Sequence, residues 1–312
     1  MKILLLGKNG QVGWELQRSL APLGELIALD ADSPYDANSG LCGDLTDLEG
    51  LAKTVRTVKP DVIVNAAAHT AVDKAENEPE LVRTINALAP GVLAQEAERA
   101  NAWLVHYSTD YVFDGGGDKP WLETDAAAPL NVYGATKLEG EQLIQQSGCR
   151  HLIFRTSWVY GARGGNFAKT MLRLARERDS LSVIDDQIGA PTGADLLADI
   201  TAHAIRTAQL RPEVSGLYHL VAGGEASWHS YASFVIDFAR RAGAPLKVAP
   251  DAIKPVPTSA FPTPAKRPHN SRMDTAKLQR TFGLNLPSWQ IGVARMLSGA
   301  PARRAKSITK LA

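Results

Sequence analysis

The chain has 312 residues, of which 45% are hydrophobic and 21% are charged, a composition typical of a compact soluble protein with one larger domain or two smaller ones. Its 34 Lys and Arg residues nearly balance 33 Asp and Glu residues, so the net charge of +1 provides no field for binding nucleic acid or an anionic membrane. We therefore expect a small-molecule or protein partner.

The cysteine content and the lengths of the apolar runs indicate in which cellular compartment the protein is expected. Cys42 and Cys149 are the only cysteines and have no Cys-x-x-Cys spacing, so a reducing environment is the simplest setting. The apolar run at residues 3–6 ends at a glycine-rich turn, too early for a signal peptide, and no other stretch approaches the roughly 20 apolar residues of a membrane span. We predict a cytoplasmic protein with no membrane and no nucleic-acid partner.

Short apolar runs alternate with helical patterns in the first half of the chain. Strands are expected at residues 2–6, 26–29, 61–65, 103–107 and 151–154, and helices at 12–20, at about 78–99 and from about 133. This alternation predicts an α/β fold, a doubly wound parallel Rossmann sheet with helices on both faces.

The pattern becomes irregular after about residue 156, where proline and glycine separate shorter elements. We predict a mainly dinucleotide-binding Rossmann domain at 1–155. A smaller, mainly substrate-binding lobe at 156–300 follows, with some segments returning to the first domain. Residues 301–312 are expected to form a flexible basic tail.

Gly7, Gly10 and Gly13 follow the first strand and open the first helix, where glycines let backbone N–H groups approach a pyrophosphate. Their spacing departs from Gly-x-Gly-x-x-Gly, so an ordinary strand-to-helix turn is the alternative. Asp30 follows the second strand, 17 residues after Gly13, where a carboxylate accepts hydrogen bonds from the adenosine ribose. Asp30 favours NADH over NADPH, although a solvated strand-end aspartate is also possible.

Two further segments are expected at the same edge of the sheet. Asp44 and Leu45 are expected against adenine, and Ala68, His69 and Thr70 follow the strand at 61–65. A lone histidine at a strand end is more often simply hydrogen-bonded than catalytic, so we expect His69 to contribute its backbone.

Tyr133 and Lys137 are four residues apart and share one face of a helix. A nearby ammonium favours a phenolate, so we expect Lys137 to bring the pKa of Tyr133 nearer neutrality and make it a proton donor and acceptor. The spacing alone also fits two incidental surface residues. Thr109, within Ser108-Thr109-Asp110-Tyr111 at a strand end, provides a hydroxyl for a carbonyl oxygen or the phenol and favours the catalytic interpretation.

Several segments together resemble the extended short-chain dehydrogenase/reductase superfamily and, within it, the dTDP-4-dehydrorhamnose reductase family. They span nearly the whole chain: 7–16, 65–73, 108–113, 129–134, 155–160, 189–193 and 267–271. The resemblance implies reduction of the C4 ketone of dTDP-4-dehydro-6-deoxy-L-mannose to dTDP-L-rhamnose with NADH or NADPH, a step in making surface polysaccharides.

The same resemblance implies roles for individual residues. Tyr133 would protonate the C4 oxygen, and Lys137 would hold the nicotinamide ribose and tune Tyr133. Thr109 and Asp110 would contact the sugar, and Trp158 would pack beside it. The dinucleotide would be surrounded by Gly10, Gln11, Val12, Asp30, Asp44, Leu45, Ala68, His69 and Thr70.

Some members of the resembled family form homodimers with magnesium held by interface carboxylates. Glu15 and Asp195 fall near positions that would contribute here, whereas Ser298-Gly299 stands where a further carboxylate is expected. A homodimer with Mg²⁺ at Glu15 is therefore an expectation with an incomplete ligand set. The alternative is that Glu15 only complements the dipole of the first helix.

Two rival functions remain. A 4-epimerase or 4,6-dehydratase of the same superfamily would show no net oxidation of its dinucleotide, and a dehydratase typically has Glu after Thr-Asp, where this chain has Tyr111. A non-catalytic regulatory subunit on this fold is the second rival, because fold alone does not fix function. Arg267, near a proline-rich run, is a candidate to grip a diphosphate.

Overall fold

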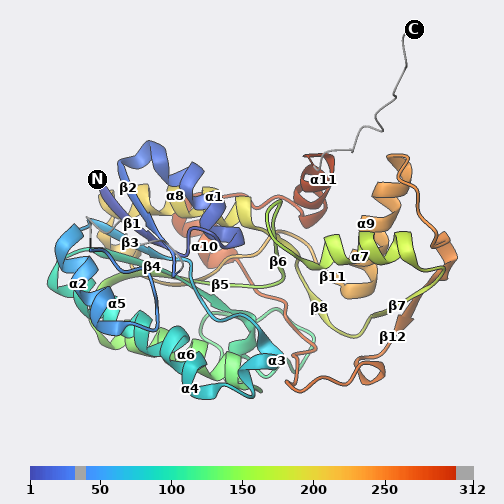
Figure 1. Ribbon diagram of the computed structural model, residues 1–312, viewed down its shortest axis with the longest axis horizontal. Coiled ribbons are helices and arrows are strands. Elements are labelled where there is room, and N and C mark those ends of the chain that lie inside the picture. The colour runs from blue at the N-terminus through green and yellow to red at the C-terminus, as the bar shows by residue number, and fades with distance from the viewer. Residues whose placement is uncertain (32–39, 300–312) are drawn as a thin grey trace, which may run out of the picture.

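The computed structural model describes residues 1–31 and 40–299, so the predicted basic tail at 301–312 lies outside the described residues. Figure 1 shows a sheet covered by helices on both faces, continued on one side by a smaller lobe. The α/β prediction is confirmed. Within the described residues Cys42 and Cys149 are buried free thiols, and no helix there is long and apolar enough to cross a membrane.

In the part of the chain that the structure describes, the central sheet has six strands, and every pair of neighbours is parallel. From one edge to the other the strands are β2 (Glu25–Leu29), β1 (Lys2–Leu6), β3 (Val62–Asn65), β4 (Trp103–Thr109), β5 (Arg150–Thr156) and β10 (Gly216–His219). The strand order reverses between β1 and β3, which places a crevice at their carboxyl ends.

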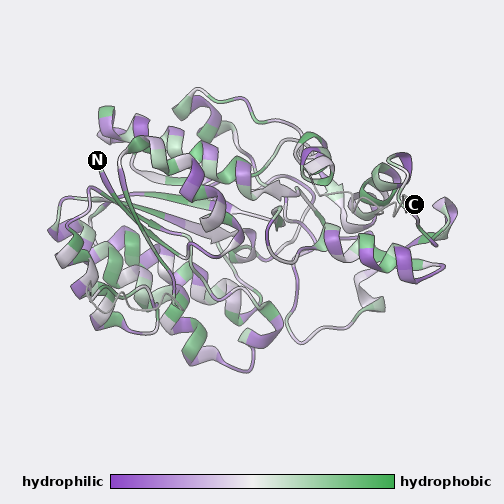
Figure 2. Ribbon diagram, turned by 45° about the horizontal axis from the view of Figure 1, so that its top comes forward, coloured by the Kyte–Doolittle hydropathy of each residue, from purple (hydrophilic) through white to green (hydrophobic). Residues whose placement is uncertain are grey.

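Helices form a layer on each face of the sheet (Figures 1 and 2), and alternating side chains of the strands belong to the two cores beneath these layers. Ile3 and Leu5 of β1 belong to one core, covered by α1 (Gln11–Leu20), α8 (Ala194–Leu210) and α10 (Ala276–Phe282). Leu4 and Leu6 belong to the opposite core, covered by α2 (Leu48–Val58), α5 (Ala89–Arg99) and α6 (Val132–Gln146). Burial of each such side chain stabilises the fold by about 1.5–3 kcal/mol, so β1 is anchored on both faces.

The single helix predicted at about 78–99 is wrong in one respect. The structure has α4 (Pro79–Arg83), a π-helical turn at Thr84–Leu88 and then α5, while α3 (Val72–Ala75) precedes them. Pro90 lacks an N–H and its ring crowds the carbonyl four residues earlier, which the wider turn relieves.

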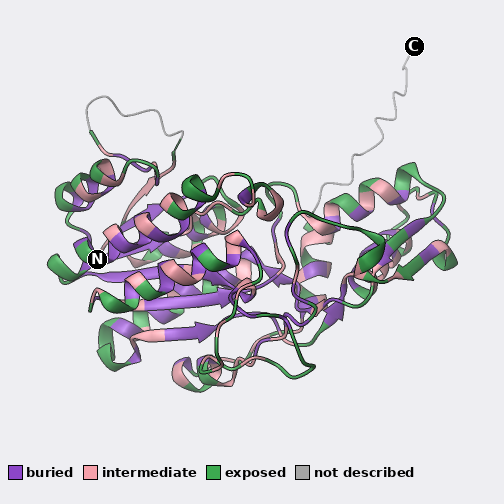
Figure 3. Ribbon diagram, turned by 90° about the horizontal axis from the view of Figure 1, so that it is seen from below, coloured by how far each residue is buried: buried purple, intermediate pink, exposed green. Residues whose placement is uncertain are grey.

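The smaller lobe is built from short elements between β5 and the end of the described chain. Its helices are α7 (Phe167–Glu177), α9 (Trp228–Arg241) and α11 (Trp289–Gly299). Its strand pairs are β6 (Val159–Tyr160) with β9 (Thr192–Gly193), β7 (Leu181–Ile184) with β12 (Ile253–Val256), and β8 (Ile188–Gly189) with β11 (Ala226–Ser227). Figure 3 shows the buried strands of the sheet beside the largely exposed outer helices of this lobe.

Candidate active site

A cavity of about 640 Å³ opens at the carboxyl ends of β1, β3, β4 and β5 and reaches the smaller lobe. Most residues that the sequence predicted for a site line it. These are Gly7, Gly10, Gln11, Val12, Asp30, Asp44, Leu45, Ala68, Thr70, Thr109, Asp110, Tyr133, Lys137 and Trp158. Gly13, His69 and Glu15 are not among the lining residues.

The glycine turn is built by close backbone approaches. Gly7 has φ of 84°, which favours glycine, and its carbonyl accepts a hydrogen bond from Gly10 N at 3.1 Å. A Cβ on Gly13 would lie 1.9 Å from Gly7 O, so a glycine at this position allows α1 to pack closely against the turn. The role of Gly13 is therefore this close packing, since it does not line the cavity. The Asp30 carboxylate accepts hydrogen bonds from the backbone N–H groups of Asn9 and Ala31, both at 2.9 Å, which ties it to this turn.

His69 is fixed through its backbone by Asn86. Its N–H donates to Asn86 Oδ1 at 2.9 Å, and its carbonyl accepts from Asn86 Nδ2 at 3.0 Å. Its imidazole lies 3.7 Å from the Glu78 carboxylate, and the residue is absent from the cavity lining. Asn86 belongs to the π-helical turn, which thereby holds the backbone after β3.

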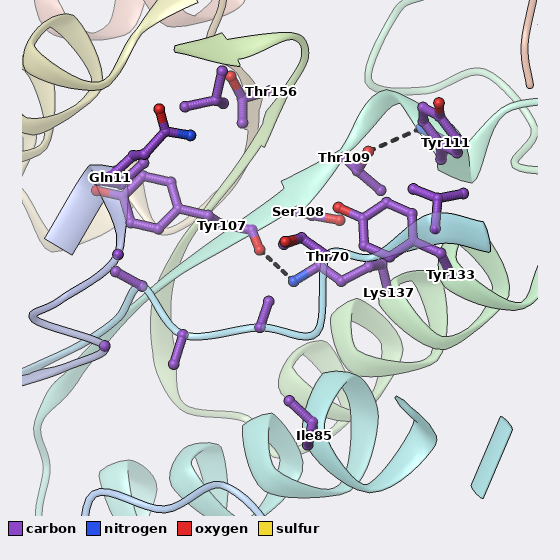
Figure 4. A pocket seen from close by; sticks show the side chains of 18 of the residues that line it. Gln11, Thr70, Ile85, Tyr107, Ser108, Thr109, Tyr111, Tyr133, Lys137 and Thr156 are labelled. Atoms are coloured by element: carbon purple, nitrogen blue, oxygen red, sulfur yellow. Dashed lines mark hydrogen bonds between the residues drawn. The ribbon is translucent and has the colours of Figure 1, made fainter. Parts of the chain in front are cut away.

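Helix α6 begins where its capping residue brings Tyr133 to the cavity. The Asn131 side chain accepts a hydrogen bond from Gly134 N at 2.8 Å. A Cβ on Gly134 would lie 2.1 Å from Tyr111 O, so only glycine allows this approach between α6 and the turn after β4. The Tyr133 phenol is thereby directed toward Thr109 (Figure 4).

The expected lowering of the Tyr133 pKa is wrong for the protein without bound ligands. Burial raises the pKa of Tyr133 to about 12, the nearby Asp110 carboxylate also raises it, and hydrogen bonding with Thr109 opposes them. The four-residue spacing predicted that the Lys137 ammonium lies on the same helical face as Tyr133. Spacing carries no information on how far the Tyr133 phenol is buried. The phenol is consequently protonated, which is the form that a proton donor requires.

Lys137 lines the cavity and is almost fully buried. Its Nζ donates to the carbonyl oxygen of Tyr107 at 2.6 Å, as Figure 4 shows, and lies 3.2 Å from His106 Nε2. Burial lowers the pKa of Lys137 to about 8, against the opposing effect of the Glu141 carboxylate. Glu141 itself forms a buried bidentate pair with Arg155, at 2.9 and 2.6 Å.

Thr109 and Asp110 form a connected polar pair at the end of β4. The Thr109 hydroxyl donates to Asp110 Oδ1 at 3.0 Å and accepts from Tyr111 N at 3.2 Å. Burial raises the pKa of Asp110 to about 6, although hydrogen bonds from Ser271 and Thr109 oppose the change. Asp110 Oδ2 is buried with no hydrogen-bond partner in the described part of the chain, so it can accept one from a ligand hydroxyl.

Two stacked aromatic rings line the same cavity. Trp158 has φ of 49°, a strained conformation for a bulky residue, and its indole stacks on that of Trp228 at a centroid distance of 3.6 Å. A Cβ on Gly189 would lie 2.8 Å from the Trp158 ring, so that glycine makes room for it. Trp228 was missed by sequence reasoning because its segment carries no strand-end signal.

The other lining residues were given no individual role from the sequence. Several of them only extend segments that the sequence did indicate, so the rule that ligands bind at strand ends would have found them. These other lining residues are, in full, Ala31, Gly43, Ala66, Ala67, Val72, Ile85, Tyr107, Ser108, Tyr111, Thr156, Ser157 and Val159.

The carboxylates expected to hold magnesium have cationic partners. Glu15 lies 3.5 Å from Arg18, and Asp195 lies 3.6 Å from Arg295. Across residues 1–31 and 40–299 no three His, Cys, Asp or Glu side chains gather as metal ligands. The described side chains of one copy of the chain therefore form no magnesium site.

Arg267 is also engaged. It forms a bidentate ion pair with Asp73, at 3.1 and 2.7 Å, and hydrogen bonds with Tyr111. It does not line the cavity, so its predicted contact with a diphosphate has no support from this geometry.

Known proteins resemble the chain over almost its full length. The dTDP-4-dehydrorhamnose reductase of Escherichia coli K12 is 62% identical over 96% of this chain and 97% of its own, and that of Salmonella typhimurium is 63% identical over the same shares. Among solved structures, the enzyme of that name from Clostridium acetobutylicum superposes with a TM-score of 0.84 at 36% identity, covering 96% of this chain and 99% of its own.

A second solved relative was crystallised with a dinucleotide. The dTDP-4-dehydrorhamnose reductase of Bacillus anthracis, in complex with NADP, has a TM-score of 0.82 at 34% identity and covers 96% of this chain and 99% of its own. The family model described as the RmlD substrate binding domain matches residues 1–301. The chain therefore belongs to the RmlD family, together with these dTDP-4-dehydrorhamnose reductases.

Proposed function

We propose that this protein reduces the C4 ketone of dTDP-4-dehydro-6-deoxy-L-mannose to give dTDP-L-rhamnose, using NADH or NADPH. The names of its relatives support the reaction and the substrate. The observation that carries the proposal is the protonated, buried phenol of Tyr133 in the same cavity as the glycine turn. A proton donor is thus placed where a dinucleotide and a ketone can meet.

A bound dinucleotide supplies the hydride that C4 receives. Tyr133 donates its proton to the C4 oxygen as that oxygen gains negative charge, because an alkoxide is a far stronger base than a phenolate. Thr109 orients the phenol, which is directed toward its hydroxyl. Lys137 in its ammonium form stabilises the phenolate that remains and holds the nicotinamide ribose.

The glycine turn fits the pyrophosphate of the dinucleotide, since Gly10 precedes the first turn of α1, where N–H groups point outward. Gln11, Val12, Asp44, Leu45, Ala68 and Thr70 line the adjoining cavity. We propose that Asp30 accepts from the adenosine ribose and favours NADH, whereas the Bacillus relative was solved with NADP. We therefore propose use of both dinucleotides, and KM values for each decide the preference.

We propose that Asp110 and Trp158 hold the sugar. Asp110 Oδ2 provides a buried acceptor for a hydroxyl, and the stacked Trp158 and Trp228 rings provide an apolar surface for a sugar face. Trp158 and Trp228 lie in the predicted substrate lobe at 156–300, whereas Asp110 lies in the predicted dinucleotide-binding domain at 1–155, so the proposed sugar site draws on both.

The test is the Tyr133→Phe variant, with Tyr218→Phe as a control outside the cavity. We expect Tyr133→Phe to lose turnover by a factor of about 10²–10⁴ while binding NADH nearly as the wild type does. Loss of nicotinamide absorbance on adding the 4-keto sugar nucleotide measures turnover and separates a reductase from an epimerase or a regulatory subunit. Near wild-type rates for Tyr133→Phe would contradict the role of Tyr133.

We propose in addition that two copies of the chain form a homodimer in the cytoplasm. Trp14 of α1 and Ile291 of α11 are exposed large hydrophobic side chains, as expected at an interface. Analytical ultracentrifugation tests the dimer. Magnesium remains a hypothesis drawn from the resemblance, and elemental analysis of the purified protein before and after EDTA treatment decides it.

A further inference from the structure

A chain of three buried polar side chains lies behind the cavity. Asn65 at the end of β3, His106 in the middle of β4 and Lys137 on α6 are each no more than 2% exposed. Asn65 Nδ2 lies 3.3 Å from His106 Nδ1, and His106 Nε2 lies 3.2 Å from Lys137 Nζ. Of these three side chains, the proposed mechanism gives a role only to Lys137.

The orientation of the Asn65 amide fixes the direction of these hydrogen bonds. Asn65 Oδ1 accepts from the backbone N–H of Ala67 at 3.2 Å, and exchanging the amide oxygen and nitrogen would place two donors against each other there. Asn65 Nδ2 therefore donates to His106 Nδ1. A neutral imidazole that accepts at Nδ1 carries its proton on Nε2.

The Nε2 proton points at Lys137, so the protonation of the lysine matters. An ammonium has only donors and would oppose the imidazole N–H, whereas a neutral amine has a lone pair that accepts it. The amine can still donate to Tyr107 O, the contact at 2.6 Å. The three contacts are all satisfied only when the lysine is neutral.

We propose that His106, oriented by Asn65, is a positioning residue that presents an N–H to Lys137 and favours its neutral amine before ligands bind. This inference rests on the proposed function, since it concerns the lysine of that site. Burial already lowers the pKa of Lys137 to about 8, and a donated hydrogen bond lowers it further. Burial also holds the pKa of His106 well below its usual value, so the imidazole stays neutral.

Other charged groups around Lys137 are accounted for. Glu141, one turn along α6, raises the lysine pKa, but its carboxylate is shared with Arg155 of β5. Tyr133 is protonated, and the Asp110 carboxylate after β4 acts on Tyr133. Across β4, β5 and α6, therefore, His106 is the group whose hydrogen-bond direction disfavours the ammonium.

The consequence for the reaction is that Lys137 changes its protonation state near neutral pH. Such a group gains and loses protons readily, as a proton relay needs. The catalytic contribution of the ammonium is lost as pH rises through the Lys137 pKa. A variant with a higher Lys137 pKa should therefore retain activity at higher pH.

The test uses Asn65→Asp, which keeps the shape and the acceptor for Ala67 N but replaces the donor with a second acceptor. Asn101→Asp, an exposed position, is the matched control for the same charge change. In the ligand-free protein, ¹⁵N NMR reports the His106 tautomer, with His106→Gln identifying its signal, and ¹³C NMR of labelled lysine reports the Lys137 pKa.

We expect the Nε2–H tautomer in the wild type. Asn65→Asp should switch it to Nδ1–H and raise the pKa of Lys137 by about 1 or more, while Asn101→Asp leaves both unchanged. The alkaline limb of kcat/KM should move upward with the lysine. An Nδ1–H tautomer in the wild type overturns the inference even where Asn65→Asp does not fold, as does an unchanged Lys137 pKa after the tautomer has switched.

Failure of the proposed function has a different signature. The NMR measurements need no turnover, so the expected tautomer and pKa shift together with an active Tyr133→Phe variant would contradict the reaction and leave the inference standing.

Discussion

The rings of Tyr111 and Tyr133 meet edge to face, with centroids 5.5 Å apart and planes at 77°. Tyr111 belongs to the 3₁₀ turn after β4, and its hydroxyl bonds to Arg267, which is paired with Asp73. A chain of contacts from Arg267, in the segment between β12 and α10, thus reaches the Tyr133 ring that is proposed to donate the proton.

Truncating Tyr111 should therefore impair catalysis without touching the reacting groups. We expect Tyr111→Ala to lower kcat by a factor of about ten or more, because small displacements of a reacting group strongly reduce rates. Tyr111→Phe keeps the edge-to-face contact and should stay within a few-fold of the wild type. Steady-state kinetics of both variants checks this, and an equal loss in both would assign the effect to the Arg267 hydrogen bond instead.

Lys137 should destabilise the fold at neutral pH. Its pKa falls from 10.5 in the unfolded chain to about 8 in the folded protein, so between these values the unfolded state binds more protons and stability rises with pH. The penalty is fully present below about pH 8 and amounts to on the order of 3 kcal/mol. Lys137→Met should therefore unfold at higher urea concentration than the wild type at pH 7.

The difference in unfolding free energy between Lys137→Met and the wild type should shrink by pH 10. Lys53→Met, at an exposed position of α2, removes a lysine without relieving burial and should show no such pattern. If the wild type is more stable than Lys137→Met at pH 7, the prediction is wrong, and the interactions of the Lys137 ammonium offset the cost of burying it.

Two glycines of the same turn should respond differently to alanine. A Cβ on Gly13 would overlap the backbone of Gly7, whereas one on Gly10 would lie 3.4 Å from Gly7 O, a tolerable contact facing the cavity. We expect Gly13→Ala to lose about 1–3 kcal/mol of stability. Gly10→Ala should keep the unfolding midpoint and bind NADH more weakly. Urea denaturation and fluorescence titration separate the two effects, and a stable Gly13→Ala protein would contradict the close packing.

Trp228 should act through Trp158. Removing its ring in Trp228→Ala leaves the Trp158 indole without its stacked partner, so we expect a several-fold rise in KM for the sugar nucleotide with little change in NADH affinity. Trp228→Phe preserves part of the stack and should fall between. If KM is unchanged in Trp228→Ala, the sugar does not depend on this stacked pair.

Strand-end residues were the part of the site that sequence predicted best. The apolar period marks where β1, β3 and β4 end, and parallel strands bring those ends to one edge, which is why Gly7, Ala68 and Thr109 share a cavity. The pKa of Tyr133 was predicted in the wrong direction because residue spacing carries no information on burial.

Other features depend on contacts between distant segments. His106 reaches Lys137 from 31 residues away, and Trp228 meets Trp158 across 70 residues. The local sequence pattern around His106 or Trp228 does not indicate which distant residue it contacts. The π-helical turn was missed for a related reason, since its role is to direct Asn86 toward His69, and the helical period of residues 78–99 hides it.

The sixth strand of the sheet has a consequence for how the protein is made. β10 pairs with β5 through Gly216–His219, about 60 residues after β5 ends, and α8 packs on α1 from within that interval. During synthesis β5 therefore waits as an unpaired edge until most of the chain has left the ribosome. A fragment ending near residue 155 would expose that edge and the uncovered face of α1, so we expect it to aggregate rather than fold as an independent dinucleotide-binding unit.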